Sequence, residues 1–135
     1  MTTVIRRPTV NELLETQSLL SVYYFFHYND LKKNINNILI LLLDDKIIGA
    51  IMYNKDFKKI YMLSIDKNYR RQQYGQLLFK TSLEIFKPYI KDKISAITTK
   101  YPTDSTEFWL SQGFKFISER ITKRGNKMWD MELVV

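Results

Sequence analysis

The chain has 135 residues, of which 45% are hydrophobic and 26% are charged, a balance typical of one soluble globular domain. It has no cysteine and one histidine, which excludes disulfides, thiolate chemistry and a histidine-based metal site. Lysine and arginine outnumber the acidic residues by 21 to 14, and the resulting net charge of +7 favours anionic partners. No stretch has the pattern of a signal peptide or a membrane span, so we expect a cytoplasmic protein that neither binds a metal nor contacts a membrane.

The N-terminal part predicts a strand followed by a helix. Residues 2–6 are short and rich in β-branched side chains. Thr9 and Glu12 have the spacing of a capping box, in which each residue satisfies a backbone N–H of the other. A helix is therefore expected from this point to about Leu20. The side chains expected to face the core are Val10, Leu13 and Leu14.

The next segment, residues 21–35, is rich in aromatic side chains but has no clean hydrophobic period, so we expect a short helix and a loop. His27 lies inside this aromatic cluster, and a packed or surface position is its simplest interpretation. The cluster itself could be core, a pocket wall or a surface for a partner chain. Its aromatic members are Tyr23, Tyr24, Phe25, Phe26 and Tyr28.

A three-stranded meander is predicted next. The apolar runs 38–43 and 47–53 are separated by a short polar connection, which is a strong hairpin signal. Gly49 lies inside the second run and indicates a β-bulge or the close approach of another group. Residues 54–59 form a polar turn, and the third strand is expected to begin at Ile60.

The stretch 60–79 joins an apolar strand to an amphipathic helix through a basic turn. The first turn of a helix carries unpaired N–H groups and a partial positive charge, and both attract anions. Arg70 and Arg71 add full positive charges beside it, and Gly75 removes a side chain where a ligand could approach. The turn therefore predicts a phosphate site, although a solvated basic turn and a helix-packing glycine remain alternatives.

The C-terminal part predicts a strand, a short helix and a hairpin. Pro88 ends the preceding helix, and 93–99 is the next strand. Residues 104–107 start a short helix for which Gly113 is a suitable C-terminal cap. Runs 114–121 and 127–134 then form the final hairpin. The element order predicts a single α+β domain over residues 1–135, with a mixed, mostly antiparallel sheet flanked by helices.

Four local patterns together resemble the GNAT superfamily of acetyl-CoA-dependent N-acetyltransferases. The turn Arg70-Arg71-Gln72-Gln73-Tyr74-Gly75 is similar to the acyl-CoA signature of that family, and residues 108–114 are similar to its aromatic-x-x-x-Gly-Phe pattern. Weaker likenesses are the Asp-Asp-Lys-Ile-Ile-Gly hairpin at 44–49 and the first strand and helix start at 3–14. The resemblance covers essentially the whole chain.

The resemblance implies acetyl-CoA as co-substrate and direct attack of an acceptor amine on the thioester. The backbone of the fourth strand would pair with the pantetheine arm, and a backbone N–H near Ile65 would polarise the thioester carbonyl. The N–H groups of the basic turn would hold the pyrophosphate. The implied cofactor-binding residues are Leu63, Ser64, Ile65, Arg70, Arg71, Gln72, Gln73, Tyr74, Gly75 and Gln76.

Three departures from the family pattern affect the chemistry. Gln73 replaces the usual first glycine, which is harmless at an ordinary φ and costs energy at a positive φ. Trp109 stands where a tyrosine often acts as general acid, and strand 60–65 lacks the common glutamate base. The acid and base are therefore unassigned, and water, Tyr61, Tyr101 or a substrate group are the candidates to replace them. Trp109 itself is either core or a cofactor contact.

The function expected from this resemblance is N-acetylation of an amine-bearing acceptor, which could be a small molecule, a protein or a tRNA-linked group. The sequence leaves open whether the chain forms a homodimer. One alternative is a binding module that keeps the acyl-CoA fold without catalysis. Another is a nucleic-acid-binding protein in which Tyr69, Arg70 and Arg71 contact the ligand.

Overall fold

The structure, a computed structural model, describes residues 1–21, 26–99, 105–121, 123–125 and 127–135. Its strands are β1 (Thr3–Arg6), β2 (Ile38–Leu43), β3 (Lys46–Tyr53), β4 (Lys59–Ile65), β5 (Lys93–Thr99), β6 (Lys115–Ile121) and β7 (Lys127–Val134). Its α-helices are α1 (Leu13–Leu20), α2 (Tyr28–Lys33), α3 (Tyr74–Phe86) and α4 (Thr106–Ser111). Within the described parts, no helix is long and apolar enough to cross a membrane.

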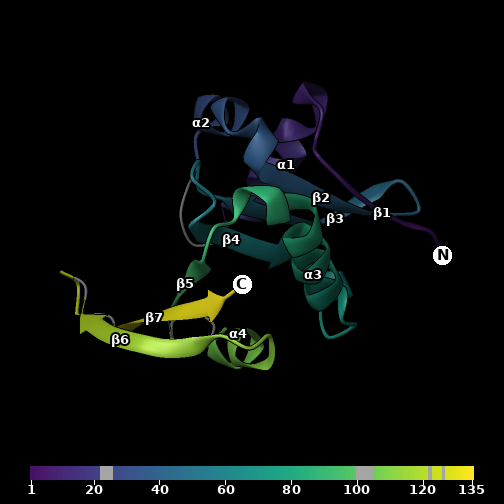
Figure 1. Ribbon diagram of the computed structural model, residues 1–135. Helices are drawn as coiled ribbons and strands as arrows, with labels where there is room; N and C mark the ends of the chain where they lie inside the picture. Colours follow the sequence, from purple (N-terminus) through teal and green to yellow (C-terminus); the bar gives the residue numbers. More distant parts are fainter. Residues whose placement is uncertain (22–25, 100–104, 122, 126) are drawn as a thin grey trace.

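The strands form one sheet in the order β1-β2-β3-β4-β5-β7-β6, with helices on both faces (Figure 1). β4 and β5 are parallel neighbours joined through α3, and the other neighbouring strands pair antiparallel. The expected α+β class with a mixed, mostly antiparallel sheet is confirmed. The chain returns after β6 to place β7 between β5 and β6, so the final hairpin extends the sheet beyond β5.

Two hydrophobic cores lie on the two faces of the sheet. α1 and α2 cover one core, and α3 and α4 cover the other (Figure 1). β2 is buried along its whole length because it contributes to both, which explains its uninterrupted apolar sequence. Its side chains alternate, with Leu39, Leu41 and Leu43 toward α3 and Ile38, Ile40 and Leu42 toward α1.

The hairpin between β2 and β3 follows from its connecting residues. Asp44 and Asp45 have φ values of 47° and 69°, the left-handed geometry that matches the twist of a two-residue hairpin. Gly49 shows both features expected of it: the β2–β3 register shifts beside it, and a Cβ atom there would lie 2.6 Å from Ile65 Cδ1. This glycine therefore lets β3 and the end of β4 pack closely.

The start of the first helix was predicted correctly, but two of its inward positions were not. Glu12 accepts a hydrogen bond from the Thr9 N–H at 2.8 Å, as a capping box requires. The first turn is a 3-10 turn, however, and α1 proper begins at Leu13. Val10 and Leu14 are 46% and 66% exposed, so their predicted burial is wrong. The buried positions follow an i, i+3, i+7 pattern and are Leu13, Thr16 and Leu20.

The aromatic segment is described only in part. Tyr23, Tyr24 and Phe25 lie outside the described residues, as does Tyr101. Phe26 is buried in the core beneath α1 and α2. His27 is exposed at the position just before α2, in agreement with a surface role.

Helix α4 ends in a complete C-terminal cap. Gly113 has a φ of +98°, and its N–H donates to the Leu110 carbonyl at 3.0 Å. The Phe114 N–H donates to the Trp109 carbonyl at 3.0 Å, which completes a Schellman motif. The predicted role of this glycine is confirmed, and the cap fixes the end of the helix that borders the pocket described below.

Candidate functional site

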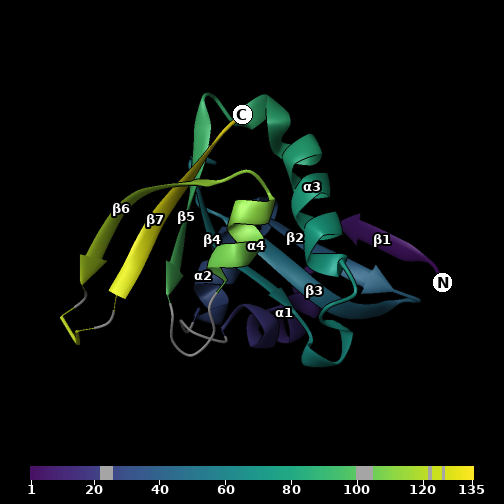
Figure 2. The same cartoon turned by 90° about the horizontal axis from the view of Figure 1, so that it is seen from below.

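Strands β4 and β5 pair only at their beginning and then separate (Figure 2). Lys59 faces Ser95 and Ile60 faces Ala96, with no further register between them. An irregularity on the opposite edge of β4 marks Tyr61 as an extra residue, since Tyr53 faces Ile60 while Met52 faces Met62. Such a bulge twists the strand, so β4 turns away from β5 and leaves part of its edge without a partner strand.

Tyr61 itself lies toward the α1 side of the sheet rather than in the basic turn. Its ring centre is 6.4 Å from that of Phe26, and the Lys59 Nζ lies 5.8 Å from it. The side chain is 46% exposed. The bulge thus presents a phenol near the narrow end of the opening between β4 and β5.

The free edge of β4 is formed by alternate residues. The Asp66 N–H donates to the Ile48 carbonyl at 2.7 Å, so Asp66 and Ser64 direct their backbone groups toward β3. Leu63 and Ile65 therefore direct theirs toward the side from which β5 has diverged. The Arg70 Nε donates to the Ile65 carbonyl at 3.0 Å, which ties the basic turn to this edge.

The basic turn before α3 contains two residues in the left-handed region. Arg71 has a φ of 62° and Gln73 a φ of 66°. Left-handed residues in a tight turn point successive N–H groups to one side, which creates an anion-binding concavity. The first hydrogen bond of α3 runs from the Leu77 N–H to the Gln73 carbonyl at 3.1 Å, so the N–H groups of 74–76 precede the helical ladder. Gln73 therefore has the positive φ that is unfavourable for a residue with a side chain. This backbone conformation costs about 1 kcal/mol relative to glycine.

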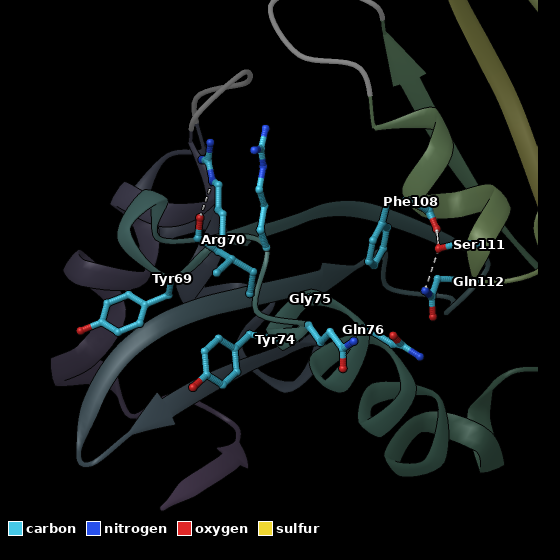
Figure 3. A pocket seen from close by; sticks show the side chains of 11 residues that line it. Tyr69, Arg70, Tyr74, Gly75, Gln76, Phe108, Ser111 and Gln112 are labelled. Atoms are coloured by element: carbon cyan, nitrogen blue, oxygen red, sulfur yellow. Dashed lines mark hydrogen bonds between the residues drawn. The ribbon is translucent and has the colours of Figure 1, made fainter. Parts of the chain in front are cut away.

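A pocket of about 310 Å³ lies between this turn, the end of β4 and helix α4 (Figure 3). Most residues of the predicted basic turn line it, and Ile65 adds the end of β4. Gln72 is exposed, and it does not line the pocket; nor do Leu63 and Ser64. The lining residues are Ile65, Tyr69, Arg70, Arg71, Gln73, Tyr74, Gly75, Gln76, Phe108, Ser111 and Gln112.

Sequence reasoning missed the α4 wall of this pocket. Phe108, Ser111 and Gln112 have the spacing i, i+3, i+4, which places them on one face of a helix. That spacing is a signal in the sequence, but only the packing of α4 on α3 shows which face borders the turn. Tyr69, which the sequence placed only in a possible nucleic-acid contact, also lines the pocket, and its ring centre lies 5.2 Å from the Lys46 Nζ.

Gly75 fits both interpretations that the sequence left open, namely space for a ligand and close packing of helices. A Cβ atom at this position would lie 3.3 Å from Phe108 Cε1 and 3.8 Å from Ile65 Cγ1. The glycine therefore lets α4 approach α3, and it also lines the pocket. Figure 3 shows Phe108 on the far side of the pocket from Tyr69 and Tyr74.

Trp109 is a core residue. It is 5% exposed, and its ring lies 5.4 Å from Phe79 and 5.0 Å from Phe114 in edge-on contacts. It does not line the pocket, and the lining contains no Asp, Glu or His. Among the described residues, no group of three potential metal ligands is present. The ionisable side chains at the pocket are therefore two arginines and two tyrosines, Tyr69 and Tyr74.

Comparison with known proteins shows what this arrangement resembles. Ard1 from Thermoplasma volcanium superposes with a TM-score of 0.84 at 13% identity, over 100% of this chain and 99% of that one. The ribosomal-protein-S18-alanine N-acetyltransferase from Escherichia coli gives 0.80 at 14%, over 99% and 94% of the two chains. The PaiA N-acetyltransferase from Thermoplasma acidophilum, solved in complex with coenzyme A, gives 0.77 at 16%, over 100% of both.

At these identities the solved structures show the fold alone. No curated protein sequence matches the chain. The family model of the acetyltransferase (GNAT) domain, however, matches residues 16–135, which is most of the sequence. The chain therefore belongs to the GNAT family of acetyltransferase domains.

Proposed function

We propose that the protein transfers an acetyl group from acetyl-CoA to an amine, with the cofactor held in the opening between β4 and β5. The observation that carries the proposal is the basic turn 70–76, whose two left-handed residues and helix N-terminus border the unpaired edge of β4. A pyrophosphate suits such a turn because anions bind helix N-termini and backbone concavities. The coenzyme A bound to the Thermoplasma acidophilum enzyme supports the same ligand here.

In this proposal each part of the site has one task. The N–H groups of the turn and the charges of Arg70 and Arg71 bind the pyrophosphate. The backbone of Leu63 and Ile65 pairs with the pantetheine arm as an added strand would. The Ile65 N–H polarises the thioester carbonyl, as an oxyanion hole does. Bound acetyl-CoA supplies the activated acyl group, and no covalent enzyme intermediate is needed.

The acceptor enters this proposal as a primary amine on a protein or a small molecule. The Escherichia coli neighbour is named for acetylating an alanine of a ribosomal protein, which makes a protein N-terminus the first acceptor to test. Tyr61 lies at the narrow end of the opening, on the α1 side, and is well placed to contact an acceptor. Because no carboxylate or histidine lines the pocket, the amine loses its proton to water in this proposal.

Release of free coenzyme A tests the activity with little background. The chain has no cysteine, so a thiol-reactive dye detects only the thiol that acetyl transfer liberates. Peptides with different free N-termini and small polyamines serve as acceptors, and the same peptides with blocked N-termini serve as controls. We expect thiol release that requires both the protein and a free amine. Equal release with blocked and free peptides would contradict amine transfer.

A second candidate function is a binding module that holds acetyl-CoA without transferring the acetyl group. The lack of Asp, Glu and His in the pocket lining and the burial of Trp109 favour it. It predicts saturable binding of acetyl-CoA together with no thiol release for any amine offered. The two candidates therefore share the cofactor site and differ in turnover.

A further inference from the structure

Strand β6 is the last strand of the sheet, and its outer edge has no partner strand among the described residues. Every residue of β6 is exposed. The apolar side chains of Phe116, Ile117 and Ile121 are 49%, 56% and 67% exposed, although such side chains usually pack on a half-buried sheet surface. An uncovered apolar edge strand is a template for pairing with another chain. The outer edge of β6 therefore has the properties of an interaction surface.

The pairing of β7 shows which backbone groups of β6 face outward. The Val135 N–H donates to the Asp92 carbonyl at 3.0 Å, so alternate residues of β7 counted from Val135 direct their backbone toward β5. The residues between them direct theirs toward β6, where Asp130 faces Ser118. Glu119 comes directly after Ser118, so its N–H and carbonyl point away from β7. An added strand would find a donor and an acceptor there.

The hairpin that carries this edge has a basic tip. Lys123 and Arg124 are exposed in the turn between β6 and β7, and neither forms an ion pair within the described parts of the chain. A Cβ atom at Gly125 would have no neighbour within 4 Å. Figures 1 and 2 show the hairpin on the opposite side of the molecule from β1. The tip therefore presents two uncompensated positive charges to an anionic partner.

The carboxylates beside the edge are already paired within the hairpin. Lys127 Nζ lies 3.6 Å from Glu119 Oε1, and Arg120 Nη2 lies 3.2 Å from Asp130 Oδ1. Lys115, at the other end of β6, is exposed and has no ion pair with any described residue. Uncompensated positive charge thus lies at both ends of the edge, with apolar side chains between.

We propose that the outer edge of β6 docks an extended acidic segment of a partner protein, which adds to the sheet as a further strand. The outward backbone groups pair with the segment, and the cations at both ends attract its carboxylates. Single-stranded RNA fits less well, because Phe116 and Trp129 meet with ring planes at 70° and form no flat stacking platform. No residue of β6 lines the acetyl-CoA pocket, so this inference is independent of the proposed function.

The probe is a synthetic peptide of alternating glutamate and valine, with its N-terminus blocked so that it cannot accept an acetyl group. Phe116 and Ile121 lie on one face of the sheet because their partners on β7, Met131 and Lys127, are four residues apart. An added strand of this sequence can place its valines beside them and its glutamates on the other face. Fluorescence anisotropy of the labelled peptide with the full chain should show saturable binding.

Two altered peptides separate charge from strand pairing. A peptide with lysine in place of glutamate keeps the alternation and should not bind. The acidic peptide with every backbone nitrogen methylated keeps its charge but cannot pair as a strand, and it should bind about tenfold more weakly or less. Because the protein is unaltered, this comparison does not depend on the folding of a variant.

Variants test the same edge from the side of the protein. Glu119→Pro removes an outward N–H at a position where an edge strand tolerates proline, and it should bind the acidic peptide about tenfold more weakly. Glu119→Ala is the matched control, because it loses the same carboxylate but keeps the N–H. Lys123→Glu with Arg124→Glu should also weaken binding about tenfold. The equal charge change Lys32→Glu with Lys33→Glu, on α2, should not.

Several results would overturn the proposal. Equal binding of the methylated and unmodified peptides would exclude strand addition, and so would equal binding by the proline and alanine variants. Absence of binding at millimolar peptide would exclude the acidic partner. Tighter binding of oligouridine would identify RNA as the occupant, and self-association of the wild type that Glu119→Pro abolishes would identify a second copy of the chain. Acetyl-CoA is absent from all these experiments, so this inference and the proposed function fail separately.

Discussion

Gln73 shows how a single backbone angle affects the candidate site. Its φ of 66° costs a side-chain-bearing residue about 1 kcal/mol, whereas glycine adopts it freely. We predict that Gln73→Gly changes the free energy of unfolding little, because the relief of strain is offset by the greater freedom of glycine in the unfolded chain, about 0.5–1 kcal/mol. Gln73→Val should destabilise by about 1–2 kcal/mol, because β-branched side chains tolerate this region worst.

Urea denaturation of the two Gln73 variants measures this difference. If the turn binds the pyrophosphate through its backbone, Gln73→Gly should also bind acetyl-CoA at least as tightly as the wild type. Stabilities that do not differ between the glycine and valine variants would contradict the strain at this position.

Glu12 makes a contribution to the free energy of unfolding that depends on pH. The guanidinium of Arg6, 2.8 Å away, donates hydrogen bonds that lower the pKa of Glu12 to about 2, against an opposing effect of burial and with help from Thr9. A lowered folded-state pKa stabilises the fold above the unfolded pKa, and this contribution disappears as pH falls from about 4.5 to about 2. Because the Arg6 side chain is 40% exposed, we expect only about 1 kcal/mol.

Acid denaturation of Glu12→Gln tests that contribution. The variant should be less stable than the wild type at neutral pH, and the difference should vanish near pH 2, where Glu12 becomes protonated. A difference that stays constant across this range would show that the effect is one of packing rather than charge.

At the scale of elements, the contact between β3 and β4 controls the shape of the cofactor opening. An alanine at Gly49 would place its Cβ 2.6 Å from Ile65 Cδ1 and 3.3 Å from the Ser64 carbonyl oxygen. We predict that Gly49→Ala destabilises the fold by about 1–3 kcal/mol, as overpacking of a core does. Ile65→Val removes the Cδ1 atom, so Gly49→Ala should cost less in that background.

A double-mutant cycle followed by thermal unfolding measures the coupling of Gly49 and Ile65. Strict additivity of the two single substitutions would show that the strand backbones, and not the Ile65 side chain, limit the approach.

The elements that sequence alone predicts well are those set by local chemistry. The capping box at Thr9, the Asp44-Asp45 hairpin and the Gly113 cap each depend on a few neighbouring residues, and the structure contains all three. The burial of Val10 and Leu14 was mispredicted because a 3-10 turn there changes the helix phase. The α4 wall of the pocket could not be predicted, because it depends on how Gly75 and Phe108 pack.

At the scale of the whole molecule, two groups of strands meet at a short seam. β1 to β4 form one side and β5, β7 and β6 the other, with only two paired positions between β4 and β5 (Figures 1 and 2). α3 crosses between these groups and begins at the basic turn, while α4 closes the outer wall. The sequence predicted the turn and the strands. The separation of β4 from β5 depends on the bulge at Tyr61, whose position in the strand only the pairing with β3 shows.

A ligand bound in this opening would contact both groups of strands and hold them together. Acetyl-CoA should therefore raise the melting temperature in proportion to the logarithm of its concentration above the dissociation constant. Much of the net charge of +7 would then serve to attract a strongly anionic cofactor.

The most direct measurement is a calorimetric titration of acetyl-CoA into the wild-type chain and into the double variant Arg71→Glu, Gly75→Asp. The account predicts saturable binding by the wild type and no binding by the variant, since its two carboxylates occupy the phosphate turn. Lys32→Glu with Lys33→Glu is the matched control, because these exposed charges lie on α2, and it should bind normally. Equal affinity of the double variant and the wild type, or no binding by the wild type at millimolar ligand, would contradict the central claim.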